Sequence, residues 1–430
     1  MLKQIAVSEL EVGMFVHKFE GSWFEHPFWK AKFLIEDAER LAAIRESRVR
    51  TVVIDTEKSR VLATAGHDAP ARPAAAGAPA PAPAPAANSR ISSIRQRTAV
   101  QVSSSQPVSM EQELTAAAAI ADRARDKLNK TIMAASLGKA LDVRKVEPVV
   151  SDILASVRRN PQAFSGLMRC KLRNEKIFRH ALSVSGLMVA LADRMRLSPP
   201  EIHNCGLAGL LLDIGVTYLP QVQTMQDPDF RHIPKHVWES HVMLGYRALK
   251  NDGDLPQAVL DACLLHHERL DGSGFPQGRS GDDIPTIARM AAICDSFEQR
   301  LAGYSGRAPM DPAQAVAELR QRGAAFDEDI LRVFVETVGL YPVGSFVVLA
   351  SRKLAMVIDE DRKDPLRPVV QAFYSLDSGE RILPHRIALA QGNDNEKIIG
   401  IADLSGLGLP EDSQLRELVF LSAFRNEARH

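Results

Sequence analysis

The sequence predicts a multidomain protein with a central all-α domain, a small α+β domain before it and a short β-rich extension after it. Three observations lead to this fold class. Between residues 163 and 338, apolar side chains recur at the i, i+3, i+4 spacing of amphipathic helices. The stretch 69–87 is almost wholly alanine and proline, so it cannot pack a core. After residue 340, apolar side chains occur in short runs that are typical of strands.

The first 62 residues are expected to form the small α+β domain. Ile5–Val7, Met14–Val16 and Thr51–Ile54 have the apolar pattern of short strands, and Ile35–Ser47 has helical spacing. Aromatic residues also cluster in this region, and the core of a small domain explains them better than a ligand platform does. These aromatic residues are Phe19, Trp23, Phe24, Phe28 and Trp29.

A linker and a helical connection are expected between this domain and the central one. Residues 63–108 combine the Ala-Pro stretch with a Ser-rich, slightly basic segment, a composition that favours an extended linker. Residues 109–162 have a helical pattern with alanine-rich turns at 116–124. Such turns are typical of a connecting helix or of a dimerisation helix. The sequence leaves both readings open, and with them a homodimer.

The central domain is assigned to residues 163–340 and the β-rich extension to residues 341–430. Helices are expected in the central domain at 177–195, 199–212, 234–249, 256–267 and 285–301. Strands are expected in the extension at 344–349, 354–359 and 368–374, and the last residues are expected to be partly helical.

Composition and charge exclude several classes of protein. With 45% hydrophobic and 25% charged residues, the 430-residue chain resembles an ordinary soluble protein. Its formal net charge of zero argues against general binding to nucleic acid or to an anionic membrane. No apolar run approaches the about 20 residues of a membrane helix, and the N-terminus does not resemble a secretory signal. Four scattered cysteines fit reduced thiols, so we expect a cytoplasmic location.

Potential metal ligands occur in order along the helical segments. Imidazole and carboxylate groups together suit iron, manganese, zinc or nickel. Such an ion lowers the pKa of a bound water, and two ions sharing a carboxylate can clamp a phosphoryl transfer. Each residue alone is weak evidence, because a single helical histidine more often lies at the surface. The ordered set is His180, Asp213, His241, His266, His267 and Asp295.

The motif that follows the paired histidines is long and specific. It reads His-His-Glu-Arg-x-Asp-Gly-Ser-Gly-x-Pro and runs from His266 to Pro276. With the Ile284–Pro285 pair and Asp295 after it, the region 165–340 resembles the HD-GYP family of helical, metal-dependent phosphodiesterases that hydrolyse cyclic di-GMP. The resemblance implies an all-α HD-type phosphohydrolase domain. Residues 1–60 also resemble a small uncharacterised domain found ahead of such modules.

The resemblance implies roles for particular residues and for two divalent ions. The implied metal ligands are His180, Asp213, His241, His266, His267 and Asp295, with Asp213, His266 and His267 also as catalytic groups. The implied substrate-binding residues are Gly274, Phe275, Pro276 and Arg307.

Several positions depart from the family pattern. The His-Asp pair of the family is Leu212-Asp213 here, so one ion loses a ligand. Val216 replaces a lysine, Tyr304 replaces an arginine of the basic turn, and Phe275 replaces the tyrosine of Gly-Tyr-Pro. The metal set is therefore expected to be partly compromised.

Three functions remain open from the sequence. The first is a phosphodiesterase, weakened or not, that converts cyclic di-GMP to pGpG or GMP. The second is a degenerate module that binds cyclic di-GMP, or a signalling protein partner, without hydrolysis. The third, a helical bundle without a ligand, leaves the ordered set of histidines and aspartates unexplained.

Overall fold

The computed structural model describes residues 2–20, 33–35, 38–45, 49–59, 106–136, 143–170, 176–220, 222, 233–251, 255–303, 307–361, 363–392 and 396–425. The chain divides into two compact units, a small one near the N-terminus and a large one that includes residues 105–430. Most of the expected linker, the aromatic residues at 23–29 and Tyr304 lie outside the described residues.

The described residues of the small N-terminal unit form a four-stranded sheet, one α-helix and the short 3-10 helix η1 (Val7–Glu9). The sheet has the order β1-β4-β2-β3, and all its pairings are antiparallel. Its core contains Val16, Ile35, Ile44 and Val52, none of which is exposed to solvent. The predicted α+β character is confirmed, and the two-residue strand β3 is an addition. The elements are β1 (Leu2–Ala6), β2 (Phe15–Glu20), β3 (Phe33–Leu34), α1 (Ala38–Arg45) and β4 (Thr51–Asp55).

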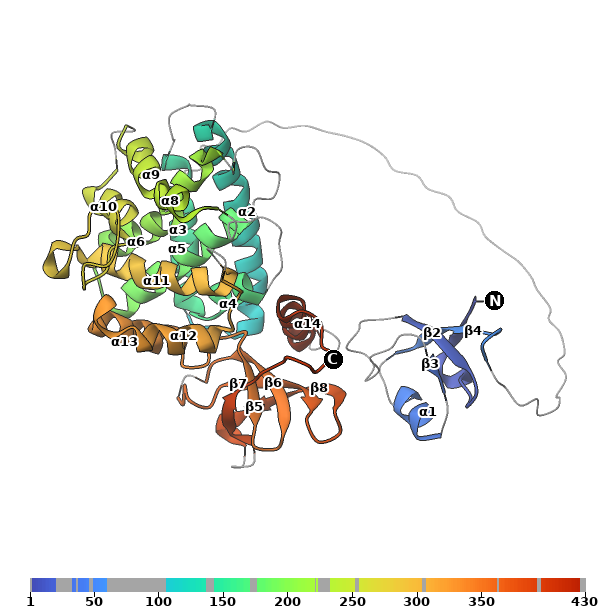
Figure 1. Ribbon diagram of the computed structural model, residues 1–430. Coiled ribbons are helices and arrows are strands. Elements are labelled where there is room, and N and C mark those ends of the chain that lie inside the picture. Colours follow the sequence, from blue (N-terminus) through green and yellow to red (C-terminus); the bar gives the residue numbers. More distant parts are fainter. Residues whose placement is uncertain are drawn as a thin grey trace, which may run out of the picture. The chain divides into compact units, whose positions relative to one another are not determined.

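The first part of the large unit is all-α, as predicted (Figure 1). Helix α5 is buried on all sides from His180 to Ala192, so it forms the centre of the bundle. The helices are α2 (Met110–Ser136), α3 (Glu147–Arg159), α4 (Ala163–Cys170), α5 (Lys176–Arg194), α6 (Pro199–Leu211), α8 (Lys235–Glu239), α9 (His241–Lys250), α10 (Gln257–Leu265), α11 (Thr286–Ala302), α12 (Pro312–Gln321) and α13 (Glu328–Val338).

One expected helix is divided in two. The continuous helix predicted for 234–249 is instead α8 and α9, which meet at Ser240. The hydroxyl of Ser240 donates to the carbonyl of Val237 at 2.6 Å, and its backbone N–H also bonds within this turn. Local hydrogen bonds of this kind compete with the regular helical pattern. The break places His241 at the first position of α9.

A buried ion pair fastens α2 to α3. Glu113, with 2% of its side chain exposed, accepts from Nε and Nη2 of Arg159 at 2.6 and 2.7 Å. The hydroxyl of Ser156 donates to the same carboxylate at 2.7 Å. Removing this carboxylate would take away the hydrogen bonds from Arg159 and Ser156 together.

The substitution Glu113→Ala is expected to destabilise the fold by about 3 kcal/mol, because it removes a mostly buried ion pair and its hydrogen bonds between α2 and α3. Urea unfolding followed by circular dichroism measures this effect. Asp152→Ala is the matched control, because it removes an exposed ion pair with Arg123 between the same two helices. Its expected effect is at most about 1 kcal/mol. Equal effects of both substitutions would contradict the prediction.

The C-terminal part of the large unit is a five-stranded antiparallel sheet followed by a helix. The strand order is β8-β7-β6-β5-β9. Phe346, Met356 and Phe373 join the main core together with Phe420 of the last helix. Strands β8 and β9 were not predicted, because both lie at sheet edges and alternate poorly between apolar and polar side chains. The elements are β5 (Phe346–Leu349), β6 (Lys353–Asp359), β7 (Val369–Ser375), β8 (Glu380–Ala388), β9 (Ile398–Ile401) and α14 (Asp412–Arg425).

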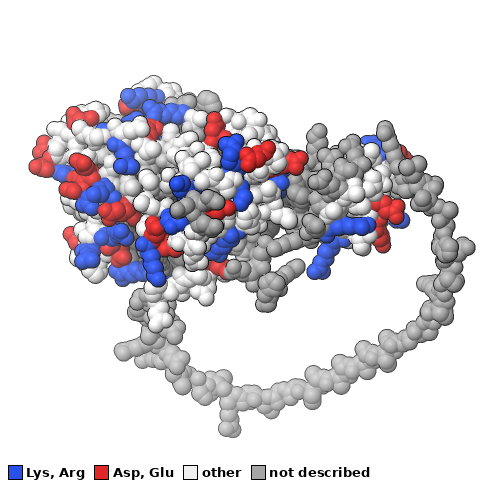
Figure 2. All heavy atoms as spheres, turned by 90° about the horizontal axis from the view of Figure 1, so that it is seen from below, with Lys and Arg blue, Asp and Glu red and all other residues white. Residues whose placement is uncertain are grey.

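The surface carries charges of both signs. Lysine and arginine side chains are interspersed with aspartate and glutamate on the face of the large unit that Figure 2 shows. This face therefore offers no extended surface of one charge, in keeping with the formal net charge of zero. None of the helices in the described part of the chain combines the length and apolar character needed to cross a bilayer.

Candidate metal centre

The structure brings all six expected ligand residues together inside the helical bundle. His180 lies on α5, and Asp213 lies two residues after the end of α6 and directly precedes the 3-10 helix η3 (Ile214–Tyr218). His241 begins α9, the adjacent histidines follow α10, and Asp295 lies within α11. Every one of them is buried. The set is His180, Asp213, His241, His266, His267 and Asp295.

Asp213 lies between the two halves of this cluster. Its Oδ1 is 3.2 Å from Nε2 of His241 and 3.5 Å from Nε2 of His266. Its Oδ2 is 3.2 Å from Nε2 of His180, which in turn lies 3.1 Å from Oδ1 of Asp295. One carboxylate thus faces two separate groups of ligand atoms. The groups are Asp213, His241, His266 and His267, and then His180, Asp213 and Asp295, with the ligand atoms of each group within 4.8 Å of one another.

Backbone carbonyls fix the tautomers of two imidazoles. Nδ1 of His241 donates to the carbonyl of Trp238 at 2.5 Å, and Nδ1 of His266 donates to the carbonyl of Cys263 at 3.0 Å. Since a carbonyl can only accept, each Nδ1 carries a proton, and Nε2 is the ring nitrogen that faces Asp213. This is the usual arrangement of a metal-binding histidine.

The atoms that point into the first group need a cation. A lone pair facing a carboxylate oxygen is favourable only when a proton or a metal ion lies between the two atoms. One divalent ion would serve all of these atoms at once, so the residues present fit a metal. The buried atoms without a hydrogen-bond partner among the described residues include Oδ1 of Asp213 and Nε2 of His241, His266 and His267.

The pKa values of Asp213 and His180 also indicate a site that attracts positive charge. Burial opposes the ionisation of Asp213, but the neighbouring imidazoles, first of all His180, outweigh it and hold the pKa of Asp213 well below its usual range. Burial likewise lowers the pKa of His180, but Asp213 and Asp295 together raise that pKa to about 10. A metal ion at these residues would displace the proton from His180.

Glu268 fastens the loop that follows the paired histidines. Its side chain is buried, and its carboxylate accepts from the backbone N–H groups of Gln277 at 2.7 Å and Arg279 at 3.1 Å. The loop is thereby pulled back onto the end of α10. The glutamate of the His-His-Glu-Arg motif therefore has a structural role, which is to hold this loop in place.

The expected substrate residues of this loop lie against the cluster. A Cβ on Gly274 would be 2.4 Å from Cα of Glu268 and 2.5 Å from the carbonyl oxygen of His267, so only glycine allows this approach. The ring of Phe275 stacks on that of His267, with centroids 4.5 Å apart and an angle of 24°. Pro276 continues the same loop. The Phe275 ring therefore lies directly beside the ligand cluster.

Arg307 is placed differently. Its side chain is 67% exposed, and its guanidinium lies 3.5 Å from Glu318 of α12. Arg300 and Arg322 pair with the same carboxylate at 3.1 and 3.5 Å. The structure therefore brings Arg307 into a basic surface group, and the contacts described for it do not reach the buried ligand residues.

The two buried departures from the family pattern are filled by apolar packing. Leu212 is 2% exposed and belongs to the main hydrophobic core. Val216 is also 2% exposed and packs with Leu219, Ile233 and Trp238. Neither side chain offers a ligand or a charge to the cluster.

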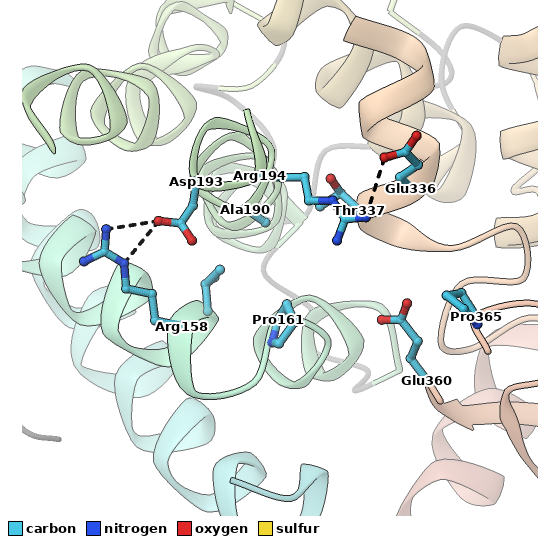
Figure 3. Close-up of a pocket in the computed structure, with 10 residues that line it drawn as sticks. Arg158, Pro161, Ala190, Asp193, Arg194, Glu336, Thr337, Glu360 and Pro365 are labelled. Atoms are coloured by element: carbon cyan, nitrogen blue, oxygen red, sulfur yellow. Dashed lines mark hydrogen bonds and ion pairs between the residues drawn. The ribbon is translucent and has the colours of Figure 1, made fainter. Parts of the chain in front are cut away.

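An open cavity of about 440 Å³ lies at the other end of α5 (Figure 3). Four of its charged side chains form two ion pairs: Arg158 with Asp193 at 3.0 Å and Arg194 with Glu336 at 3.5 Å. None of the six candidate ligands lines it. The cavity therefore has no part in the chemistry of the buried cluster.

Comparison with known proteins identifies the chain. Residues 2–146 match a domain of unknown function, DUF3391, and residues 149–330 match the HD domain. The chain is 33% identical over 406 residues to "Cyclic di-GMP phosphodiesterase PA4108" of Pseudomonas aeruginosa, covering 93% of this chain and 92% of that protein. The chain belongs to the HD-GYP family.

Two further comparisons differ in coverage. The chain is 28% identical over 166 residues to "3'3'-cGAMP-specific phosphodiesterase 2" of Vibrio cholerae, which is 38% of this chain and 32% of that protein. A solved structure, the HDG"Y"P protein Bd1817 from Bdellovibrio bacteriovorus, covers 78% of this chain and 99% of its own, with a TM-score of 0.43 and 13% identity.

The sequence did not reveal the residues that hold the candidate ligands in place. The amide of Gln299 donates to Asp295 at 2.8 Å, and carbonyls three residues before His241 and His266 hold those rings. The signal for Gln299 was present, since four residues along a helix bring two side chains onto one face. The role of Glu268 gave no such signal, because its partners are backbone groups of a loop.

Proposed function

We propose that the chain is a metal-dependent phosphodiesterase that hydrolyses cyclic di-GMP to pGpG or GMP. The observation that supports it most is the position of Asp213, whose two oxygens face two groups of buried ligand atoms. The HD-GYP membership and the name of the relative from Pseudomonas aeruginosa support the substrate.

Two divalent ions fit the arrangement. The first ion would be held by Asp213 and the three imidazoles of its group, a set that suits iron, manganese, zinc or nickel. The second would be held by His180, Asp213 and Asp295, a set richer in oxygen. When bound, such ions activate a water and neutralise phosphate charge.

The chain's own residues would orient the substrate. Asp213, His266 and His267 form the catalytic set, and the Phe275 ring beside His267 restricts how a ligand approaches. Gly274 and Pro276 would contribute close backbone and apolar contacts from the same loop. Arg307 would bind a phosphate, because its side chain is 67% exposed and the ion pair described for it, with Glu318 at 3.5 Å, is weak enough to exchange.

A second candidate is a degenerate module that binds cyclic di-GMP, or a signalling protein, without hydrolysis. The packing of Leu212 and Val216 into apolar cores favours it, since neither position supplies a ligand or a charge. Losing a direct metal ligand generally costs more than the 10–100-fold of an outer contact. A homodimer through residues 109–162 and a cytoplasmic location stay predictions.

One experiment separates these candidates. The purified full-length chain is analysed for bound metals and then assayed with cyclic di-GMP and 3'3'-cGAMP under manganese and, without oxygen, iron. Two ions with turnover of cyclic di-GMP supports the first candidate. Dinucleotide binding without turnover supports the second, and turnover of 3'3'-cGAMP alone corrects the substrate. A chain with neither metal nor binding overturns both.

Leu212→His is expected to raise hydrolysis about tenfold or more, because it adds an imidazole beside Asp213. It is also expected to destabilise the fold by about 1–3 kcal/mol, since position 212 is buried in the core. Turnover, bound metal and thermal unfolding are compared with wild type. Leu212→Met, which keeps the volume and adds no ligand, is the control. Unchanged turnover with an intact fold would show that the missing histidine does not limit activity.

A further inference from the structure

Asp295 uses its two carboxylate oxygens differently. Its Oδ1 lies 3.1 Å from Nε2 of His180, on the side of the second ligand group. Its Oδ2 accepts a hydrogen bond from the side-chain amide of Gln299 at 2.8 Å and lies 3.7 Å from Nδ1 of His267. The carboxylate is completely buried, so solvent does not supply these contacts.

The chemistry of the amide fixes the direction of this hydrogen bond. An ionised carboxylate only accepts, so the NH₂ group of Gln299 must face Asp295. Gln299 lies one helical turn after Asp295 on α11, and the helix therefore holds both ends of the contact. The donor is also neutral. It orients the carboxylate without cancelling the negative charge that attracts a cation, as a lysine or an arginine would.

We propose that Gln299 is a positioning residue that sets the affinity of the second ion. With Oδ2 engaged by the amide, Asp295 offers a single oxygen, Oδ1, to an ion shared with His180 and Asp213. The amide also holds the carboxylate in the orientation in which Oδ1 faces His180 and Oδ2 faces His267. This inference rests on the proposed metal centre and adds to it a residue outside the ligand set.

The test is a calorimetric titration of the metal-free full-length chain with manganese, which measures the affinity of each ion. Gln299→Met keeps the length of the side chain and removes the donor. The second manganese ion is expected to bind about 10–100-fold more weakly, as is typical when a contact to a metal ligand is lost. The first ion, held by the three-imidazole group, is expected to bind unchanged. A purely structural role would not affect one site alone.

The chain offers a matched control. Gln257 donates to Asp261 at 2.8 Å, also four residues apart on one helix, but this pair is exposed on α10 and lies outside the ligand set. Gln257→Met is expected to leave both manganese affinities unchanged. Gln299→His, which can again donate an N–H, is expected to restore part of the lost affinity.

The outcomes distinguish this inference from the proposed function. If wild type binds two ions and Gln299→Met binds them equally well, Gln299 has no positioning role and the metal centre stands. Equal weakening at both sites also overturns the inference, because it indicates general damage. If wild type binds no second ion, the proposed centre fails and this inference fails with it. Thermal unfolding of each variant establishes that the fold is intact.

Discussion

Asp213→Asn is expected to abolish hydrolysis, with a loss on the order of a thousandfold or more, and to reduce the number of bound ions. Asp213 is the one residue common to both ligand groups. Removing its negative charge weakens the attraction for both ions and leaves the imidazoles of His241 and His266 facing a neutral amide. Metal analysis and turnover of cyclic di-GMP by the purified variant measure the two effects.

The control for this substitution is Asp193→Asn. Asp193 lies on α5 like His180 but at its far end, where it pairs with Arg158 on the surface. Turnover and metal content are expected to match wild type. If Asp213→Asn kept both ions and at least a tenth of the activity, the shared carboxylate would not be part of the reaction and the proposed mechanism would have to be abandoned.

Gly215→Ala is expected to disrupt the centre without touching a ligand. A Cβ at this position would lie 1.9 Å from the carbonyl oxygen of His241 and 2.6 Å from the backbone nitrogen of Gly245. These are backbone atoms, so η3 and α9 would have to move apart, and His241 would move with α9. We expect a loss of about 2–4 kcal/mol in stability. A displacement of about 1 Å would lower turnover about a hundredfold.

Thermal unfolding and metal analysis of Gly215→Ala measure both parts of this expectation. Gly400→Ala is the matched control, because a Cβ there meets no atom within 4 Å and the backbone is not in the left-handed region. The control is expected to behave as wild type. A Gly215→Ala variant with wild-type stability and metal content would show that the contact between η3 and α9 yields easily.

The helices and the candidate ligands could be predicted from the sequence for related reasons. Apolar spacing along 177–195 and 285–301 indicates the buried face of a helix. This pattern does not depend on which other helix packs against that face. The ordered histidines and aspartates lie on or next to helices that pack together. Residues far apart in the sequence therefore form one cluster in the structure. The resemblance to the HD-GYP family indicated which of the histidines and aspartates belong to the ligand set.

What escaped the sequence depends on contacts between distant segments. Strand β8 has an irregular burial pattern and contains Pro384, and it is a strand because β7 pairs with it. The side chain of Leu212 packs into the main hydrophobic core, and only the structure shows this packing. The exposed place of Arg307 follows from its pairing with Glu318 across a turn, which spacing alone does not reveal.

The sharing of Asp213 has a thermodynamic consequence. If one carboxylate serves two ions, the sites cannot fill independently, because the first ion both neutralises part of the anion and fixes its orientation. Charge repulsion then opposes the second ion while preorganisation favours it, and the balance appears as a coupling free energy that is equal in both directions. The occupancy of the centre would then depend on metal supply in a cooperative or anticooperative way. The turnover of its substrate would therefore change with the concentration of available metal.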